Sequence, residues 1–245
     1  MKLFIIFILS LVLATVGYGQ TPTTDPTATI PSRVAAPGAE PDLPGTLTMN
    51  FGFNFLNGAP GDMSLRFWPS KGVSFYYLYD VPLGESKFSF HPGFGVAFES
   101  YAFEQNVTVE YPIGADSAQI VSLDAEQYEA VDKSKLVTHY VDVPLEFRFY
   151  TKENQRGFMV ALGGKVGYLF SSYTKIAYED EGRELVDKSK QDSHFNLRRV
   201  RYGAHARLGF RGIHLHGQYM FSDLFRSEGG PAANNYKIGL SFALF

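Results

Sequence analysis

The chain has 245 residues and a formal net charge of −3, contains no cysteine, and is 45% hydrophobic, 16% aromatic and 19% charged. Without cysteine it can hold no disulfide framework, no cysteine-ligated metal site, no thiol nucleophile and no lipid-modified N-terminal cysteine. The near-neutral charge gives no reason to expect nucleic acid as a partner.

Residues 1–19 have the pattern of a secretory signal peptide. Lys2 supplies the positive start, residues 3–16 form an almost unbroken apolar run, and Gly17 and Gly19 place small residues before a cleavage site. The apolar run is shorter than the roughly 20 residues that a membrane-spanning helix needs. We therefore favour a cleaved signal peptide over a retained anchor.

Residues 20–45 contain six prolines among threonines and alanines. Proline at this density removes backbone hydrogen-bond donors and favours an extended, solvated chain. We predict a periplasmic tether that acts as a spacer, with a binding role for this segment as the alternative.

From residue 46 onward, hydrophobic residues recur with a period of two, which is the period of a β-strand. In the last segment, for example, Ile238 and Leu240 flank Gly239. Eight segments follow this pattern, and each is long enough for the roughly 9–11 residues of a tilted transmembrane strand. They cover residues 47–55, 73–81, 87–99, 140–150, 158–171, 199–211, 213–222 and 236–244.

Alternation alone fits a soluble barrel or sandwich, with its apolar row inside, as well as an outer-membrane barrel, with its apolar row toward lipid. Loop lengths favour the membrane barrel, because short and long connections alternate. The polar row is also rich in glycine, arginine and lysine, which is typical of a narrow lumen. For residues 46–245 we therefore predict an all-β fold, an eight-stranded antiparallel up-and-down transmembrane β-barrel. The long connections cover residues 56–71, 105–136, 177–195 and 226–234.

The last segment ends in Phe242, Leu244 and Phe245. Barrel-assembly machinery recognises a terminal strand that carries an aromatic residue, so we interpret these residues as a C-terminal assembly signal. Leu244 has the parity of the apolar row, whereas Phe245 has the parity of the polar row. The signal is therefore out of phase with the commonest arrangement.

Three stretches carry the sequences YLYDVPLG at 77–84, HPGFG at 91–95, with Pro92, Gly93 and Gly95, and YVDVPLEFRF at 140–149, with Pro144. They resemble the PorT-like outer-membrane β-barrel domain of Bacteroidota, and the resemblance covers residues 47–245. It implies an eight-stranded outer-membrane barrel, and some members of that family support type IX secretion. Because proline cannot donate to a β-ladder, Pro144 predicts a bulge or a local break in its strand.

A barrel of eight strands is just wide enough for side chains to fill its lumen. Charged residues must pair there, because burying an isolated charge is costly. In the periplasmic half of the barrel we predict that three acidic residues face three arginines. The acidic residues are Asp80, Asp142 and Glu146, and the arginines are Arg148, Arg207 and Arg211. The whole predicted ion-pair network is Asp80, Glu99, Asp142, Glu146, Arg148, Arg207 and Arg211. An anion pore lined by the surplus of bases is the alternative.

Histidines suggest two further sites. His205, His214 and His216 share the polar row, but Arg207 beside them disfavours a divalent cation, so we predict no metal site. His139 lies on the apolar row near a loop end, where some lipid-modifying barrel enzymes keep a catalytic histidine. No serine and carboxylate stand at a compatible spacing, so we predict no catalytic residue and no cofactor.

The connection at residues 105–136 carries more acidic than basic residues. It could bind a cationic partner or Ca²⁺, but no liganding spacing of the EF-hand kind is present. We interpret it as a solvated loop whose charges repel its neighbours.

These features predict an outer-membrane β-barrel protein with a structural, scaffolding or interaction role in the cell envelope. The alternatives are an accessory component of type IX secretion, an outer-membrane lipid-modifying enzyme and a small anion pore. The expected partners are outer-membrane lipid, the barrel-assembly machinery and envelope or secretion proteins, with no nucleic acid.

Overall fold

The computed structural model describes residues 45–110, 118–123, 130–152, 157–180, 183–190, 194–226 and 230–244. The predicted signal peptide 1–19 and residues 20–44 of the predicted tether lie outside the described residues. Gly45, which we assigned to the tether, is the first residue of the first strand.

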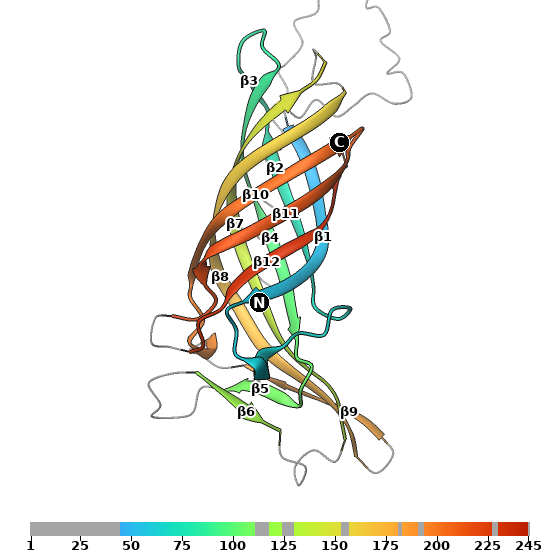
Figure 1. Cartoon of the computed structure of the whole chain (residues 1–245), viewed down its shortest axis with the longest axis vertical. Helices are drawn as coiled ribbons and strands as arrows, with labels where there is room; N and C mark the ends of the chain where they lie inside the picture. The colour runs from blue at the N-terminus through green and yellow to red at the C-terminus, as the bar shows by residue number, and fades with distance from the viewer. Residues whose placement is uncertain are drawn as a thin grey trace, which may run out of the picture. The chain divides into compact units, whose positions relative to one another are not determined.

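Eight strands form a closed antiparallel barrel, as the sequence predicts (Figure 1). Each strand pairs with its neighbour in the chain, and the pairing of β1 with β12 closes the ring. No described helix is long and apolar enough to cross a membrane. The barrel strands are β1 (Gly45–Asn57), β2 (Lys71–Tyr79), β4 (Phe88–Ala102), β7 (Ala130–Tyr150), β8 (Phe158–Asp180), β10 (Val200–Phe210), β11 (Ile213–Asp223) and β12 (Asn234–Ala243).

Short elements lie at both ends of the barrel. The strand β3 (Val81–Pro82) pairs with β4 at the end that carries the short turns. At the opposite end lie the hairpin of β5 (Val107–Glu110) and β6 (Gln119–Ser122) and the strand β9 (Arg183–Ser189), which pairs with β8 (Figure 1). Two 3-10 turns complete the described elements, η2 (Gly61–Met63) and η3 (His194–Asn196).

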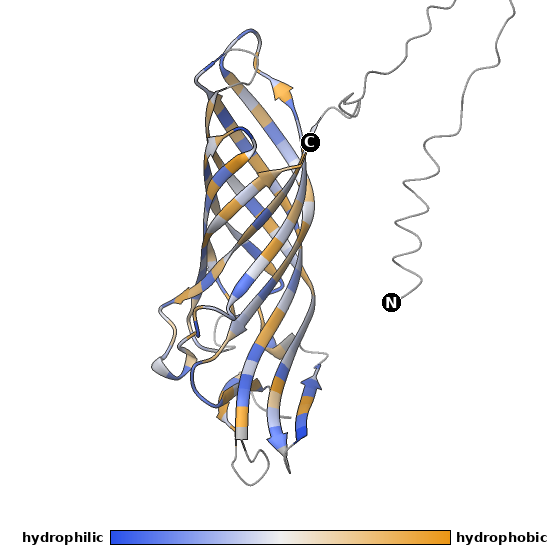
Figure 2. Ribbon diagram, turned by 90° about the vertical axis from the view of Figure 1, so that its right-hand side faces the viewer, coloured by the Kyte–Doolittle hydropathy of each residue, from blue (hydrophilic) through white to orange (hydrophobic). Residues whose placement is uncertain are grey.

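Hydropathy alternates along the barrel strands (Figure 2). The burial of the side chains shows that the apolar row faces outward and the polar row faces the lumen. Phe94 is 64% exposed and Leu162 is 63% exposed, whereas the charged Lys237 is fully buried. This inversion of the usual pattern is expected of a barrel whose outer surface is solvated by lipid.

A bulge shifts the parity of β8 near the end that carries the long connections. Tyr140 of β7 pairs with Leu169, but the preceding His139 pairs with Ser171, so Phe170 is an extra residue. Beyond this bulge Ser172 is buried and Ser171 is only half-buried. The lumen position that alternation predicts for Ser171 is therefore wrong, because one inserted residue moves every later side chain to the other face.

Pro144 faces the lumen and is buried. The β4–β7 ladder pairs Pro92 with Leu145 and then resumes at Gly95 with Asp142, in the same register. Pro144 thus lies at a local gap in the ladder that contains no inserted residue. The missing proline N–H accounts for this gap.

Apolar side chains fill the barrel end that carries the long connections. Tyr101, Phe103 and Leu136 belong to one buried cluster with Phe195 and Phe225. The β5–β6 hairpin lies within the connection at residues 105–136 and contributes to the same cluster. We expected this connection to be a solvated loop. Short turns mark the periplasmic side of outer-membrane barrels, so we call the end with the apolar cluster the extracellular end and the end with the short turns the periplasmic end.

Candidate functional site

The polar row of the lumen forms two groups of interacting side chains. The first, here called the central network, consists of Tyr76, Glu99, Asp142, Lys165, Arg201, Gln218 and Lys237. The second, the periplasmic network, lies closer to the short turns and consists of Asp80, His91, Glu146, Arg148, His205 and Arg207.

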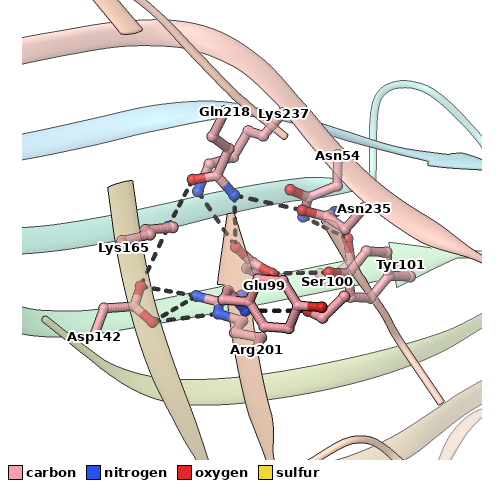
Figure 3. Close-up of polar contacts among 12 residues, drawn as sticks. Asn54, Glu99, Ser100, Tyr101, Asp142, Lys165, Arg201, Gln218, Asn235 and Lys237 are labelled. Atoms are coloured by element: carbon pink, nitrogen blue, oxygen red, sulfur yellow. Dashed lines mark hydrogen bonds and ion pairs between the residues drawn. The ribbon is translucent and has the colours of Figure 1, made fainter. Parts of the chain in front are cut away.

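The central network joins one side chain from each of seven barrel strands, and Figure 3 labels all of them except Tyr76. Arg201 Nη2 donates to Asp142 Oδ2 at 2.8 Å, and Arg201 Nη1 donates to Glu99 Oε2 at 2.8 Å. Lys165 Nζ lies 3.3 Å from Asp142 Oδ2 and donates to Gln218 Oε1 at 2.8 Å. These contacts connect opposite walls of the barrel.

Further contacts hold the basic side chains of the central network. Lys237 Nζ lies 3.5 Å from Glu99 Oε1, and the Arg201 guanidinium lies 3.5 Å from the centre of the Tyr140 ring. The network therefore contains two carboxylates and three basic side chains, all buried. Buried charges tolerate such an environment only when they are paired and hydrogen-bonded.

Glycines on β8 leave the space that the bridging side chains occupy. Gly167 pairs with Asp142 on one side and with Arg201 on the other. A Cβ at this position would overlap Asp142 Oδ1 and lie 2.9 Å from Arg201 Nε. The acid of β7 and the base of β10 meet across β8 because a glycine stands between them.

The periplasmic network is centred on Glu146. Arg148 Nε donates to Glu146 Oε1 at 2.6 Å, and Arg207 Nε donates to Glu146 Oε2 at 2.9 Å. Asp80 extends the group, because one of its oxygens lies 2.6 Å from His91 Nδ1 and 3.8 Å from Arg148 Nη1. One carboxylate thus holds two arginines from different strands side by side.

The structure places six of the seven predicted network residues in these two groups. Asp142 pairs with Arg201 and Lys165, which were not among the predicted partners. Arg211 lies outside both groups, exposed in the β10–β11 turn, and makes no ion pair with another described residue. Arg211 differs from the other predicted residues because it lies in a turn at the end of the barrel, where its side chain is not forced into the lumen.

Sequence reasoning left five members of the central network out of the predicted set. They are Tyr76, Lys165, Arg201, Gln218 and Lys237. Their parity on the polar row was the available signal, and it placed them in the lumen. Choosing their partners requires the stagger between strands that are far apart in the sequence.

The polar-row histidines His205, His214 and His216 are buried in the lumen, as is His91 of the periplasmic network. The described part of the chain contains no group of three or more His, Cys, Asp or Glu side chains that could hold a metal ion. The rings of His205 and His216 lie 6.5 Å apart, and His205 Nε2 lies 3.1 Å from Glu146.

His139 faces outward near the extracellular end, as its parity predicts. Its described contacts are aromatic rings, with centroids 5.1 Å away for Phe98 and 5.8 Å away for Phe170 and Tyr173. Ser171 is its cross-strand partner, but no hydrogen bond joins the two side chains. The arrangement has the contacts of an interfacial aromatic belt.

Pro92, Gly93 and Gly95, which carry part of the family resemblance, belong to β4. Gly93 and Gly95 face the lumen, where a Cβ would meet Leu78 Cδ2 at 2.6 Å and Tyr76 Cδ1 at 2.5 Å. Pro92 has the parity of the outward row. The two glycines thus make room for large side chains on β2.

The proposed C-terminal signal is only partly described. Phe242 is the pairing partner of Met49 on β1 and of Ile213 on β11. Leu244 is 51% exposed and continues the outward row. Phe245 lies outside the described residues.

Cavities differ sharply along the lumen. Between the two networks, a cavity of about 10 Å³ is lined by Tyr76, Glu146, Lys165 and other side chains. A second cavity of about 10 Å³ lies near Tyr101 and Tyr140. At the periplasmic mouth, by contrast, a cavity of about 600 Å³ opens beside the Arg211–Gly212 turn.

Comparison with known proteins adds a family and a structural neighbour. The family described as outer membrane protein beta-barrel domain matches residues 45–226. No curated protein matches the chain. Among solved structures, Ail, the attachment invasion locus protein of Yersinia pestis in complex with the heparin analogue sucrose octasulfate, is 11% identical. The match covers 81% of this chain and 96% of that chain, with a TM-score of 0.36.

Proposed function

The chain belongs to the outer membrane protein beta-barrel domain family, and we propose that it is a non-conducting scaffold or interaction protein of the cell envelope. The observation that carries this proposal is the central network, which fills the barrel with paired side chains from seven strands. Localisation of the barrel in the outer membrane follows from the family, and a periplasmic position of residues 20–44 is part of the proposal.

The contents of the lumen support a non-conducting barrel. Ion conduction requires a continuous wet path with binding weak enough for release. Here the two cavities next to the central network are about 10 Å³ each, close to the volume of one water probe. Opening a path would separate the buried Arg201 from Asp142 and Glu99, which is costly.

The extracellular end supports an interaction role. The strand β9 is exposed along its whole length, and its Val186 is 51% exposed. The long strands β7 and β8 reach the same end, at which β9 pairs with β8. Such an extension adds surface for a partner without adding to the lumen.

Planar-bilayer recording tests the absence of conduction. The purified full chain should give a conductance indistinguishable from buffer, while a 16-stranded porin in the same bilayer gives open channels. Stable single-channel steps from the wild-type protein would overturn the proposal and favour the anion pore. A double variant, Arg201→Ala with Lys237→Ala, should raise the conductance if these side chains close the lumen.

Cross-linking in intact cells tests the interaction role. A photo-reactive residue at Val186 should give defined adducts with envelope proteins, whereas the same residue at the lipid-facing Leu162 should not. Equal adducts from both positions would contradict a partner on β9. Recovery of type IX secretion components in the Val186 adducts would favour the finer, PorT-like assignment that the residues at 140–149 suggest.

The remaining expected partners belong to the same proposal. Outer-membrane lipid would contact the outward row, and the barrel-assembly machinery would bind the terminal strand with Phe242 and Leu244. A lipid-modifying enzyme is the weaker alternative, because the described contacts of His139 are aromatic rings. Acyl release from outer-membrane lipid that is lost in His139→Ala would establish that alternative.

A further inference from the structure

The periplasmic mouth of the barrel holds a cavity of about 600 Å³, which is within the usual size range of small-molecule sites. Its walls come from the ends of β1, β7, β8, β10, β11 and β12. This cavity lies beside the periplasmic network and is separate from the central network that carries the proposed function.

The charge of the cavity wall is one-sided. Four basic side chains line it, Arg148, Lys152, Arg207 and Arg211, and no aspartate or glutamate is among its lining residues. Glu146 pairs with Arg148 and Arg207, which lie at the floor. Lys152 and Arg211, at the rim, make no ion pair with another described residue, so both positive charges are unpaired within the described part of the chain.

A hydrogen-bond donor at the floor is also unused. The buried Nη2 atom of Arg148 has no hydrogen-bond partner among the described residues. Nδ1 of His214, which lines the cavity as well, also has no partner among them, and it donates or accepts according to the tautomer of the ring. An unsatisfied buried donor is costly, and a ligand that accepts from it removes that cost.

The backbone gives an independent observation about Arg211. This residue has a φ of 52° in a two-residue turn, a conformation that asparagine or glycine adopts more easily. Arginine is therefore an unfavourable choice for the turn alone. Its long side chain lines the cavity, which gives a reason for its presence there.

We propose that this cavity binds a ligand that carries two or more phosphate groups. Guanidinium groups match phosphate oxygens in geometry and charge, and arginines from β7 and β10 face one space. A volume of about 600 Å³ exceeds the need of a single phosphate. Such groups are present on soluble diphosphates and on anionic lipid headgroups, and the experiment distinguishes these sources.

The test is titration of inorganic pyrophosphate into the full chain in phosphatidylcholine nanodiscs, followed by calorimetry at low salt. We expect saturable binding with one site per chain. The double variant Lys152→Gln with Arg211→Asn should bind at least about tenfold more weakly. Asparagine fits the positive φ at position 211, so this variant should keep its turn.

A matched control removes the same charge at the other end of the barrel. The double variant Lys188→Gln with Lys190→Gln changes two exposed lysines near β9 and should bind pyrophosphate like the wild type. No saturable binding by the wild type, or equal losses in both double variants, would overturn the proposal. Heat-modifiable migration on gels confirms that each variant is folded.

Nanodiscs that contain cardiolipin, an anionic lipid with two phosphate groups, identify the source of the phosphates. A lower apparent affinity for pyrophosphate in these discs, of the same size in the wild type and in the Lys188→Gln with Lys190→Gln control, supports a lipid headgroup in the site. An unchanged affinity supports a soluble ligand. Both results require the pyrophosphate site, and the bilayer recordings that test the proposed function do not depend on it.

Discussion

Arg201 and Asp142 form a two-point pair across β8, with Nη2–Oδ2 at 2.8 Å and Nε–Oδ1 at 3.2 Å. Their strands are not neighbours, and the pair closes over Gly167 of the strand between them. The same guanidinium also reaches Glu99. Arg201 is thus the side chain on which two buried carboxylates depend.

Replacing this arginine should strongly destabilise the barrel. Arg201→Met leaves Asp142 and Glu99 each with a weaker lysine partner, so we expect a loss of about 3–5 kcal/mol in the free energy of unfolding. Equilibrium urea unfolding in lipid vesicles measures the change. The control Arg199→Met alters an exposed arginine two residues away and should stay within about 0.5 kcal/mol of wild type. Equal effects of the two substitutions would contradict a role of the buried pair.

A single methyl group at Gly167 should have a large effect. Its Cβ would overlap Asp142 Oδ1 and crowd Arg201, so Gly167→Ala should lower the yield of folded barrel and its stability by about 2 kcal/mol or more. Gly217→Ala is the matched control, because a Cβ there meets nothing within 4 Å. Heat-modifiable gel migration after refolding gives the folded fraction. If both alanine variants fold equally well, the lumen has more room than the structure indicates.

The barrel could be predicted from the sequence because lipid and lumen impose opposite demands on successive residues. The row with Phe94 faces lipid and the row with Glu99 faces the lumen, and each shows in the pattern. The pattern is weaker in the extensions at the extracellular end, because β9 is exposed along its whole length and the first residues of β7 are mostly polar. It therefore gave no sign that β7 begins at Ala130 or that β9 follows β8, and both regions were expected to be loops.

The alternation of polar and apolar residues could not predict which side chains pair with one another inside the lumen. The alternation predicts that Asp142 and Arg201 both face the lumen. It does not predict the height of either residue along the barrel axis. Height depends on the stagger of successive strands, which accumulates around the barrel. Asp142 was therefore expected beside the arginines of the periplasmic half, and it lies in the central network.

The turn at Arg211 should become more stable with a residue suited to its backbone. Arg211 and Gly212 have φ values of 52° and 81°, which is the pattern of a type I′ turn. Arg211→Asn should raise the free energy of unfolding by up to about 1 kcal/mol, whereas Arg211→Val should lower it. Urea unfolding in vesicles compares the two. A stabilising valine would show that the positive φ is not maintained in the membrane.

Trp68, the only tryptophan of the chain, should report contact between the β1–β2 connection and lipid. Its side chain is 71% exposed, and its ring lies 5.7 Å from that of the outward-facing Phe53, which also stacks on Phe67 at 4.3 Å. Because tryptophan favours the membrane interface, we expect its fluorescence in vesicles to be blue-shifted and quenched by brominated acyl chains. Acrylamide in the water phase should quench it weakly.

A substitution at Phe53 tests whether Trp68 packs on the barrel wall or is only close to it. Phe53→Ser removes the ring that both Phe67 and Trp68 contact, so it should increase acrylamide quenching and decrease quenching by brominated lipid. The control Phe94→Ser changes an outward phenylalanine on β4 that has no described ring contact with Trp68, and it should leave both signals unchanged. Strong acrylamide quenching in the wild type would place Trp68 in water and contradict an anchoring role for this connection.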